Sequence, residues 1–139
     1  MIRVPSGQVE NPQQLTAVVA GPDGANRLFI LDGQLQVGLG GNGPVKETFS
    51  VLLGPVLTRR QFVQATGTAS LTGFGFNNVV ANSFVIWSIN SVDADWDDES
   101  GQVEMRIEVS ASSNGTGIQV NKLGYHVTIL AEIAPTPLP

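Results

Sequence analysis

Apolar and polar residues alternate most regularly in the last third of the chain. In residues 102–111 every second side chain is apolar, at Val103, Met105, Ile107, Val109 and Ala111. Successive side chains of a β-strand point to opposite faces, so this pattern predicts a strand with one buried and one solvated face. Residues 122–133 repeat the pattern with apolar side chains at Leu123, Tyr125, Val127, Ile129, Ala131 and Ile133.

A tight turn is expected between these two segments. Asn114-Gly115 suits it because a tight hairpin requires positive φ angles, which asparagine and glycine adopt readily. A further strand over residues 83–96 precedes them, and the three segments together predict an antiparallel meander. In that first strand the parity of the apolar residues changes near Asn90-Ser91. Either a β-bulge restores one continuous apolar face, or both faces of the strand are partly buried, and the sequence leaves both interpretations open.

Shorter strand-like segments precede the meander. They comprise residues 15–20, 27–31, 34–39, 48–53, 56–64 and 65–76. Typical turn residues separate several of them, namely Gly21-Pro22-Asp23-Gly24, Asp32-Gly33 and Gly54-Pro55. The glycine-rich residues 38–44 are a candidate hinge. We therefore predict one antiparallel β-sandwich or jelly-roll-like domain of about eight to ten strands over residues 15–133, without substantial helix.

Neither end of the chain shows strand periodicity. Residues 1–14 contain Pro5 and Pro12 and predict an extended arm that donates at most a short edge strand. Such an arm is mobile in a free monomer and can clasp a neighbour in an assembly. Residues 134–139 are half proline and predict a polyproline-like extension, because proline lacks the backbone N–H that a sheet requires.

Charge is scarce in this chain. Charged residues make up 14% of the sequence and apolar residues 42%, whereas about a quarter of a typical soluble domain is charged. A surface with so few charges is either covered by small polar residues or buried against other copies. The net charge of −5 argues against nucleic acid and anionic membranes, since both require a basic surface. With no cysteine, secretion signal or membrane-spanning segment, we expect a soluble protein without disulfides.

The densest charge run lies in residues 93–99. Asp93, Asp95 and Asp97 have the spacing of carboxylates in a calcium-binding loop, which makes calcium a candidate ligand. The sixth position of such a loop requires glycine, and this chain has Asp98 there. The alternative interpretation is a solvated turn between two strands, which its charge keeps from aggregating.

Trp96 stands among these carboxylates. An aromatic ring beside Asp95 and Asp97 can hold a sugar by stacking on it while the carboxylates accept hydroxyl hydrogens. Alternatively, Trp96 ends the core face of its strand. We predict no catalytic residue, because the single histidine, His126, falls on a polar strand face and no Gly-x-Ser-x-Gly turn supplies a nucleophile.

These observations favour a non-enzymatic, self-associating structural module, such as a subunit of a virion, tail, fibre or surface appendage. Its expected partner is a further copy of the same chain. The alternative is a lectin-like, carbohydrate-binding sandwich that uses Trp96, Asp95 and Asp97 and is assisted by calcium at Asp93, Asp95 and Asp97. Neither hypothesis involves nucleic acid, membrane insertion or a cofactor other than calcium.

Overall fold

The computed structural model describes residues 1–21, 24–41, 43–77, 79 and 82–132, and this part of the chain is built almost entirely from β-strands. Its elements are β1 (Ile2–Arg3), the 3-10 helix η1 (Ser6–Gln8), β2 (Val9–Gly21), β3 (Gly24–Gly41), β4 (Val45–Leu53), β5 (Phe62–Asn77), β6 (Val85–Trp96), β7 (Val103–Ser113) and β8 (Gly117–Glu132). They form two four-stranded sheets with the orders β1-β4-β7-β6 and β2-β3-β8-β5. Paired strands are antiparallel, except that β1 is parallel to β4.

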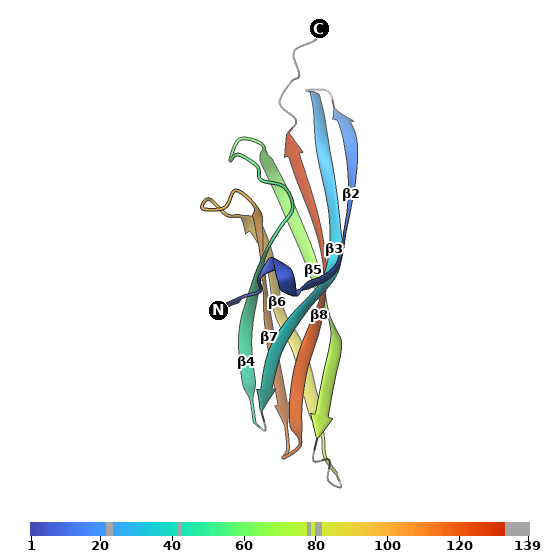
Figure 1. Cartoon of the computed structure of the whole chain (residues 1–139), viewed down its shortest axis with the longest axis vertical. Coiled ribbons are helices and arrows are strands. Elements are labelled where there is room, and N and C mark those ends of the chain that lie inside the picture. The colour runs from blue at the N-terminus through green and yellow to red at the C-terminus, as the bar shows by residue number, and fades with distance from the viewer. Residues whose placement is uncertain (22–23, 42, 78, 80–81, 133–139) are drawn as a thin grey trace.

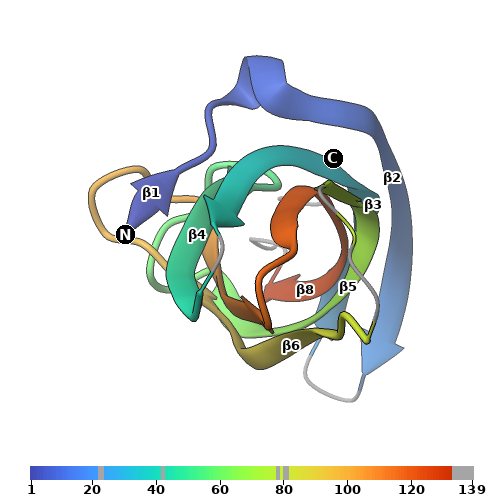
Figure 2. The same cartoon turned by 90° about the horizontal axis from the view of Figure 1, so that it is seen from below.

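The two sheets lie face to face along the long axis of the molecule (Figure 1) and enclose one apolar core (Figure 2). Alternate side chains of each strand point inward and fill this core. The largest buried side chains are Leu35, Phe49, Val51, Met105, Ile107, Leu123 and Ile129. The expected all-β sandwich is therefore confirmed.

The two regularly alternating segments form β7 and β8, and their apolar faces are buried as predicted, except that Ile133 lies outside the described residues. The prediction that β7 and β8 are neighbours in a meander is wrong. β7 pairs with β4 and β6, whereas β8 pairs with β3 and β5. The chain turns near Gly115, which has a φ of 101°, and crosses to the opposite sheet. Alternation shows which face of a strand is buried but not which strand lies beside it, and here the two buried faces meet across the core.

The expected β-bulge in β6 is confirmed. Ile89 pairs with Val109 and Ser91 pairs with Glu108, so Asn90 is the extra residue. The bulge keeps the apolar side chains on one face, because a one-residue insertion reverses the parity of everything that follows. The partly buried residues of that face are Trp87, Ile89, Val92, Ala94 and Trp96.

The turn predicted at Asp32-Gly33 does not exist. β3 runs without interruption from Gly24 to Gly41 and pairs with β8 along most of its length. Gly33 lies opposite Tyr125, and a Cβ atom on Gly33 would be 2.6 Å from the tyrosine hydroxyl oxygen. The glycine is therefore needed for packing against Tyr125 rather than for a turn.

The N-terminal residues are attached to the sandwich at two places. β1 adds a two-residue edge strand to β4, and Val4 is buried. β2 begins at Val9, within the segment expected to be an arm, and a bulge at Asn11-Pro12 accommodates the proline. The glycine-rich candidate hinge is largely strand, since β3 continues to Gly41.

Some expected features lie outside the described residues. These are the Pro22-Asp23 part of the first turn, position 42 of the candidate hinge, and the proline-rich tail at 134–139. Among the described residues, no helix has the length and apolar character needed to cross a membrane.

Candidate functional site

The acidic run lies at the upper end of the β6–β7 pair, where the loop 97–102 joins the two strands, below the upper ends of β2 and β3 (Figure 1). Asp93 and Asp95 are exposed on β6 and pair with Arg106 and Glu104 of β7. The residues around a hollow of about 120 Å³ at this place are Asp93, Asp95, Trp96, Asp97, Glu104 and Arg106. We call these six residues and the loop 97–102 the acidic end. The structure thus brings the predicted ligand residues together.

Glu104 is a buried carboxylate within the acidic end, with 7% of its surface exposed. Arg106 Nε donates a hydrogen bond to Glu104 Oε1 over 2.6 Å, and the Arg3 guanidinium donates to Oε2. The hydrogen bond to Glu104 raises the pKa of Arg106. Two cations therefore already neutralise this carboxylate. Within the described part of the chain, no three acidic, histidine or cysteine side chains are placed to hold a metal ion.

Asp97 closes the loop that follows β6. The backbone N–H and the hydroxyl of Ser100 donate to Asp97 Oδ2 over 3.0 and 2.7 Å. The hydrogen bond from the Ser100 hydroxyl lowers the pKa of Asp97. A carboxyl with a lowered pKa stays ionised at neutral pH, whereas a general acid needs a raised one. Asp97 is therefore suited to stabilising the turn.

The Trp96 ring lies on the core side of β6 and is partly buried. Its Nε1 donates hydrogen bonds to the carbonyl oxygens of Leu57 and Gly101, over 3.0 and 3.1 Å. The Arg59 guanidinium stands 5.9 Å from the ring centre, within cation–π range. Asp95 is the preceding strand residue and points to the opposite face. The contacts of the Trp96 ring are thus made with other residues of the same chain. This agrees with the interpretation that Trp96 ends the core face of its strand.

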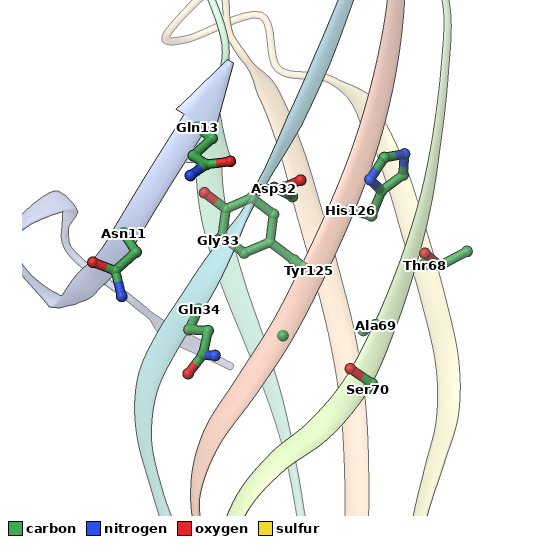
Figure 3. Close-up of a pocket in the computed structure, with 11 residues that line it drawn as sticks. Asn11, Gln13, Asp32, Gly33, Gln34, Thr68, Ala69, Ser70, Tyr125 and His126 are labelled. Atoms are coloured by element: carbon green, nitrogen blue, oxygen red, sulfur yellow. The ribbon is translucent and has the colours of Figure 1, made fainter. Parts of the chain in front are cut away.

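A second polar region lies on the outer face of the other sheet (Figure 3). Asp32, His126 and Thr68 form a row across β3, β8 and β5. Gly124 lies in the next row, beside an open groove of about 400 Å³. The groove is lined mainly by polar residues, which include Asn11, Gln13, Asp32, Gln34, Ser70 and His126.

The row Asp32, His126 and Thr68 has the residue types of a nucleophilic triad. In such a triad a hydrogen bond orients the histidine and another links it to the hydroxyl. In the described part of the chain no hydrogen bond joins these three side chains, and all three are exposed. The arrangement therefore lacks the preorganisation that nucleophilic catalysis requires. Sequence reasoning missed the row because the pairing of β3, β8 and β5 joins residues far apart in the chain.

The end of the molecule opposite the acidic end is built from three charge-free runs of sequence, which are residues 33–45, 61–92 and 109–121. The register brings parts of all three together at the lower end in Figure 1. We call residues 35–41, 71–77, 79, 84–89, 109–113 and 117–121 the uncharged end. At the start of β4, Lys46 is ion-paired with Glu108 and Glu47 with the N-terminal amine.

Large apolar side chains are exposed at the uncharged end. At least half of the surface of each of the following is exposed: Phe74, Phe76, Val79, Phe84 and Ile86. The Phe74 ring packs against Trp87 with centroids 4.4 Å apart, which joins β5 to β6 at the seam between the sheets. Aromatic enrichment together with charge depletion is typical of the core of a protein interface.

Comparison of the chain with models of protein families, with characterised proteins and with solved structures gave no match. A function can therefore be inferred only from the chemistry of these regions. The acidic end is occupied by its own hydrogen bonds and ion pairs, and the polar groove lacks a preorganised reactive group. The uncharged end exposes apolar side chains to water.

The uncharged end was not found by following periodicity and motifs. Its signal in the sequence is the absence of charge over residues 61–92, combined with Phe74, Phe76, Phe84 and Ile86 in that run. A long segment without charge is unusual in a chain of net charge −5, and its exposed large apolar side chains set this surface apart from the rest of the molecule.

Proposed function

We propose that the protein is a non-enzymatic structural module that assembles with copies of itself through the uncharged end. The observation that carries this proposal is the exposure of the Phe76, Phe84 and Ile86 side chains on a part of the molecule without charged residues. Monomeric proteins rarely expose a contiguous apolar patch of more than a few hundred Å². Burial against another copy removes this surface from water and is favourable.

The position of the patch supports a structural role. It lies at one extremity of an elongated molecule (Figure 1), so a contact there extends an assembly along the long axis. The acidic end lies at the opposite end of the β6–β7 pair, below the upper ends of β2 and β3 (Figure 1), and ionised carboxylates such as Asp97 repel the same region of another copy. A subunit of a fibre, tail, virion or surface appendage fits this combination.

The test introduces charge into the uncharged end. We expect the double variant Phe76→Asp, Ile86→Asp to weaken self-association at least tenfold, because carboxylates would have to be desolvated in the contact. Both side chains are more than half exposed, at 56% and 58%, so the single chain should remain folded. Sedimentation velocity from micromolar to near-millimolar concentration measures the association.

The matched control is Val56→Asp, since Val56 is apolar and 73% exposed but lies in the loop between β4 and β5, at the acidic end. This variant should associate as the wild type does. A wild-type chain that stays at its monomer mass of 14.6 kDa over the whole range would overturn the proposal, and so would equal association of the double variant.

A further inference from the structure

β2 is a long strand that takes almost no part in the core. It spans Val9–Gly21 at the edge of its sheet, outside β3 (Figure 2). None of its described side chains is buried, and from Pro12 to Ala20 every residue except the half-buried Ala17 is exposed. The exposed side chains nevertheless include three large apolar ones, Leu15, Val18 and Val19. A strand with both faces in water is stabilised by little more than its backbone hydrogen bonds to β3.

The free edge of β2 is also unprotected. Glu10 and the bulge at Asn11-Pro12 end the regular edge on one side, and residues 13–21 beyond them contain no charge and no proline. Proteins usually protect an exposed edge strand with charges, proline or bulges. A flat, apolar and uncharged edge of this length is suited to pairing with another strand.

The other edges of the described sheets are less suitable for such pairing. β1 is two residues long, and β5 lies against β6 at the seam between the sheets. β6 carries the bulge at Asn90 and the exposed Asp93 and Asp95. Pairing β2 with β6 of another copy would place Leu15 or Val19 beside these carboxylates. Pairing β2 with β2 brings no charges together.

We propose that the β2 strands of two copies pair antiparallel about a two-fold axis at Ala17, so that two four-stranded sheets become one eight-stranded sheet. This inference rests on the proposed self-association and adds a second contact to it. Antiparallel pairing of identical strands is self-complementary, as a two-fold contact requires. In this register Ala17 lies opposite Ala17 of the second copy, and Leu15 lies opposite Val19.

The register follows from the side chains of β2. Leu15, Ala17 and Val19 share one face of the strand, together with Leu28 and Ile30 of β3 and Leu130 of β8. Pairing Leu15 with Val19 continues this apolar face across the two-fold axis. Directly opposed apolar side chains on neighbouring antiparallel strands stabilise the pair. A shift by one residue would place Leu15 opposite Ala20 or Val18, which belong to the other face of β2. The face that carries Leu15 would then continue into the opposite face of the second copy.

The absence of native cysteine permits a direct test by cross-linking. In the proposed register the Cβ atoms of two Ala17 residues come within about 5.5 Å, close enough for a disulfide after small adjustment. We expect Ala17→Cys to form a covalent dimer under mild oxidation, seen on a non-reducing gel. The added substitution Leu15→Lys should reduce the yield severalfold, because it places a charge against the apolar face of the second copy.

The matched control is Ala25→Cys, which lies in the same hairpin on β3, is exposed, and is one strand away from the free edge. Equal cross-linking of the two variants would overturn the β2 contact. If Ala17→Cys does not cross-link while Phe76→Asp, Ile86→Asp still abolishes association, the β2 contact fails and the proposed function stands. Cross-linking that persists in a chain whose association is unaffected by Phe76→Asp, Ile86→Asp supports the β2 contact and rejects the uncharged end.

Discussion

The two ends of the sandwich differ in how their side chains are partnered within the single chain. At the acidic end three side chains have partners within the chain: Glu104 with two arginines, Asp97 with Ser100, and the Trp96 N–H with two carbonyl oxygens. At the uncharged end, Phe76 and Ile86 face water. The buried and hydrogen-bonded groups of one end have their partners in the single chain, and the other end is the one that we propose to bind another copy.

If the proposed function is right, a conspicuous motif need not mark the functional surface. The acidic run has the residue types of a calcium or sugar site, yet its geometry serves the loop and the buried Glu104. The uncharged end has no motif, but apolar surface in water carries a free-energy cost that association removes. We therefore expect substitutions at the acidic end to change the stability of the single chain, and substitutions at the uncharged end to change association.

The largest effect on stability is expected for Glu104→Ala. It removes two charge-assisted hydrogen bonds from a buried carboxylate, and we expect the free energy of unfolding to fall by about 2 kcal/mol. The loss is smaller than for a fully buried pair because Arg3 and Arg106 are about half exposed and can be hydrated. Urea unfolding of dilute, monomeric protein measures it.

Glu108→Ala is the control for this substitution, since Glu108 lies on the same strand face and pairs with the exposed Lys46 over 3.4 Å. A surface ion pair contributes less than about 0.5–1 kcal/mol. Glu104→Ala should leave association unchanged. A variant that unfolds like the wild type but no longer associates would reverse the roles assigned to the two ends.

A smaller effect is expected for Phe74→Ala, which tests whether the uncharged end is wholly separate from folding. The Phe74–Trp87 ring pair joins β5 and β6, and an aromatic pair of this kind contributes about 1 kcal/mol. We expect the free energy of unfolding to fall by about that amount and association to weaken as well. Phe76→Ala, which removes a ring without such a partner in the described chain, should weaken association only.

Equal losses of stability in the two alanine variants would show that the Phe74–Trp87 contact does not contribute to folding. Tryptophan fluorescence provides a second measurement, because Phe74→Ala exposes the Trp87 ring to water and should shift its emission to longer wavelength. Phe76→Ala should leave the emission of the dilute protein unchanged.

Local patterns in the sequence predicted the position and buried face of a strand better than they predicted which strands lie beside it. The alternation of β7 and β8 identified the buried residues Met105 and Val127, and the change of parity in β6 located the bulge at Asn90. Burial of one strand face is a property of a single segment and is visible within it. The choice of partner strand depends on contacts across the core, so β7 and β8 were wrongly expected to pair.

The sequence could not distinguish a glycine in a turn from a glycine inside a strand. Asp32-Gly33 has the composition of a tight turn, but Gly33 lies inside β3 because the Tyr125 side chain occupies the space of its Cβ atom. Tyr125 is far from Gly33 in the sequence, and no local pattern connects the two. The uncharged end, in contrast, was visible as the charge-free residues 61–92 and could have been found by examining where charges are absent.

The smallest expected effect is a difference in how the acidic end and the uncharged end respond to pH. The hydrogen bond from Ser100 lowers the pKa of Asp97 in the folded state, so ionised Asp97 stabilises the fold. This contribution is fully present above the unfolded pKa of about 3.9 and is lost as the pH falls through the lower, folded value. The stability difference between the wild type and Asp97→Ala should therefore be constant near neutral pH and shrink below about pH 4.

Asp98→Ala, which removes an exposed neighbour without a hydrogen bond in the described loop, should give a smaller difference at neutral pH. Association through the uncharged end, where no side chain titrates, should not weaken over the same range; if it falls together with the Asp97 contribution, the two ends are coupled and the contrast between them is wrong.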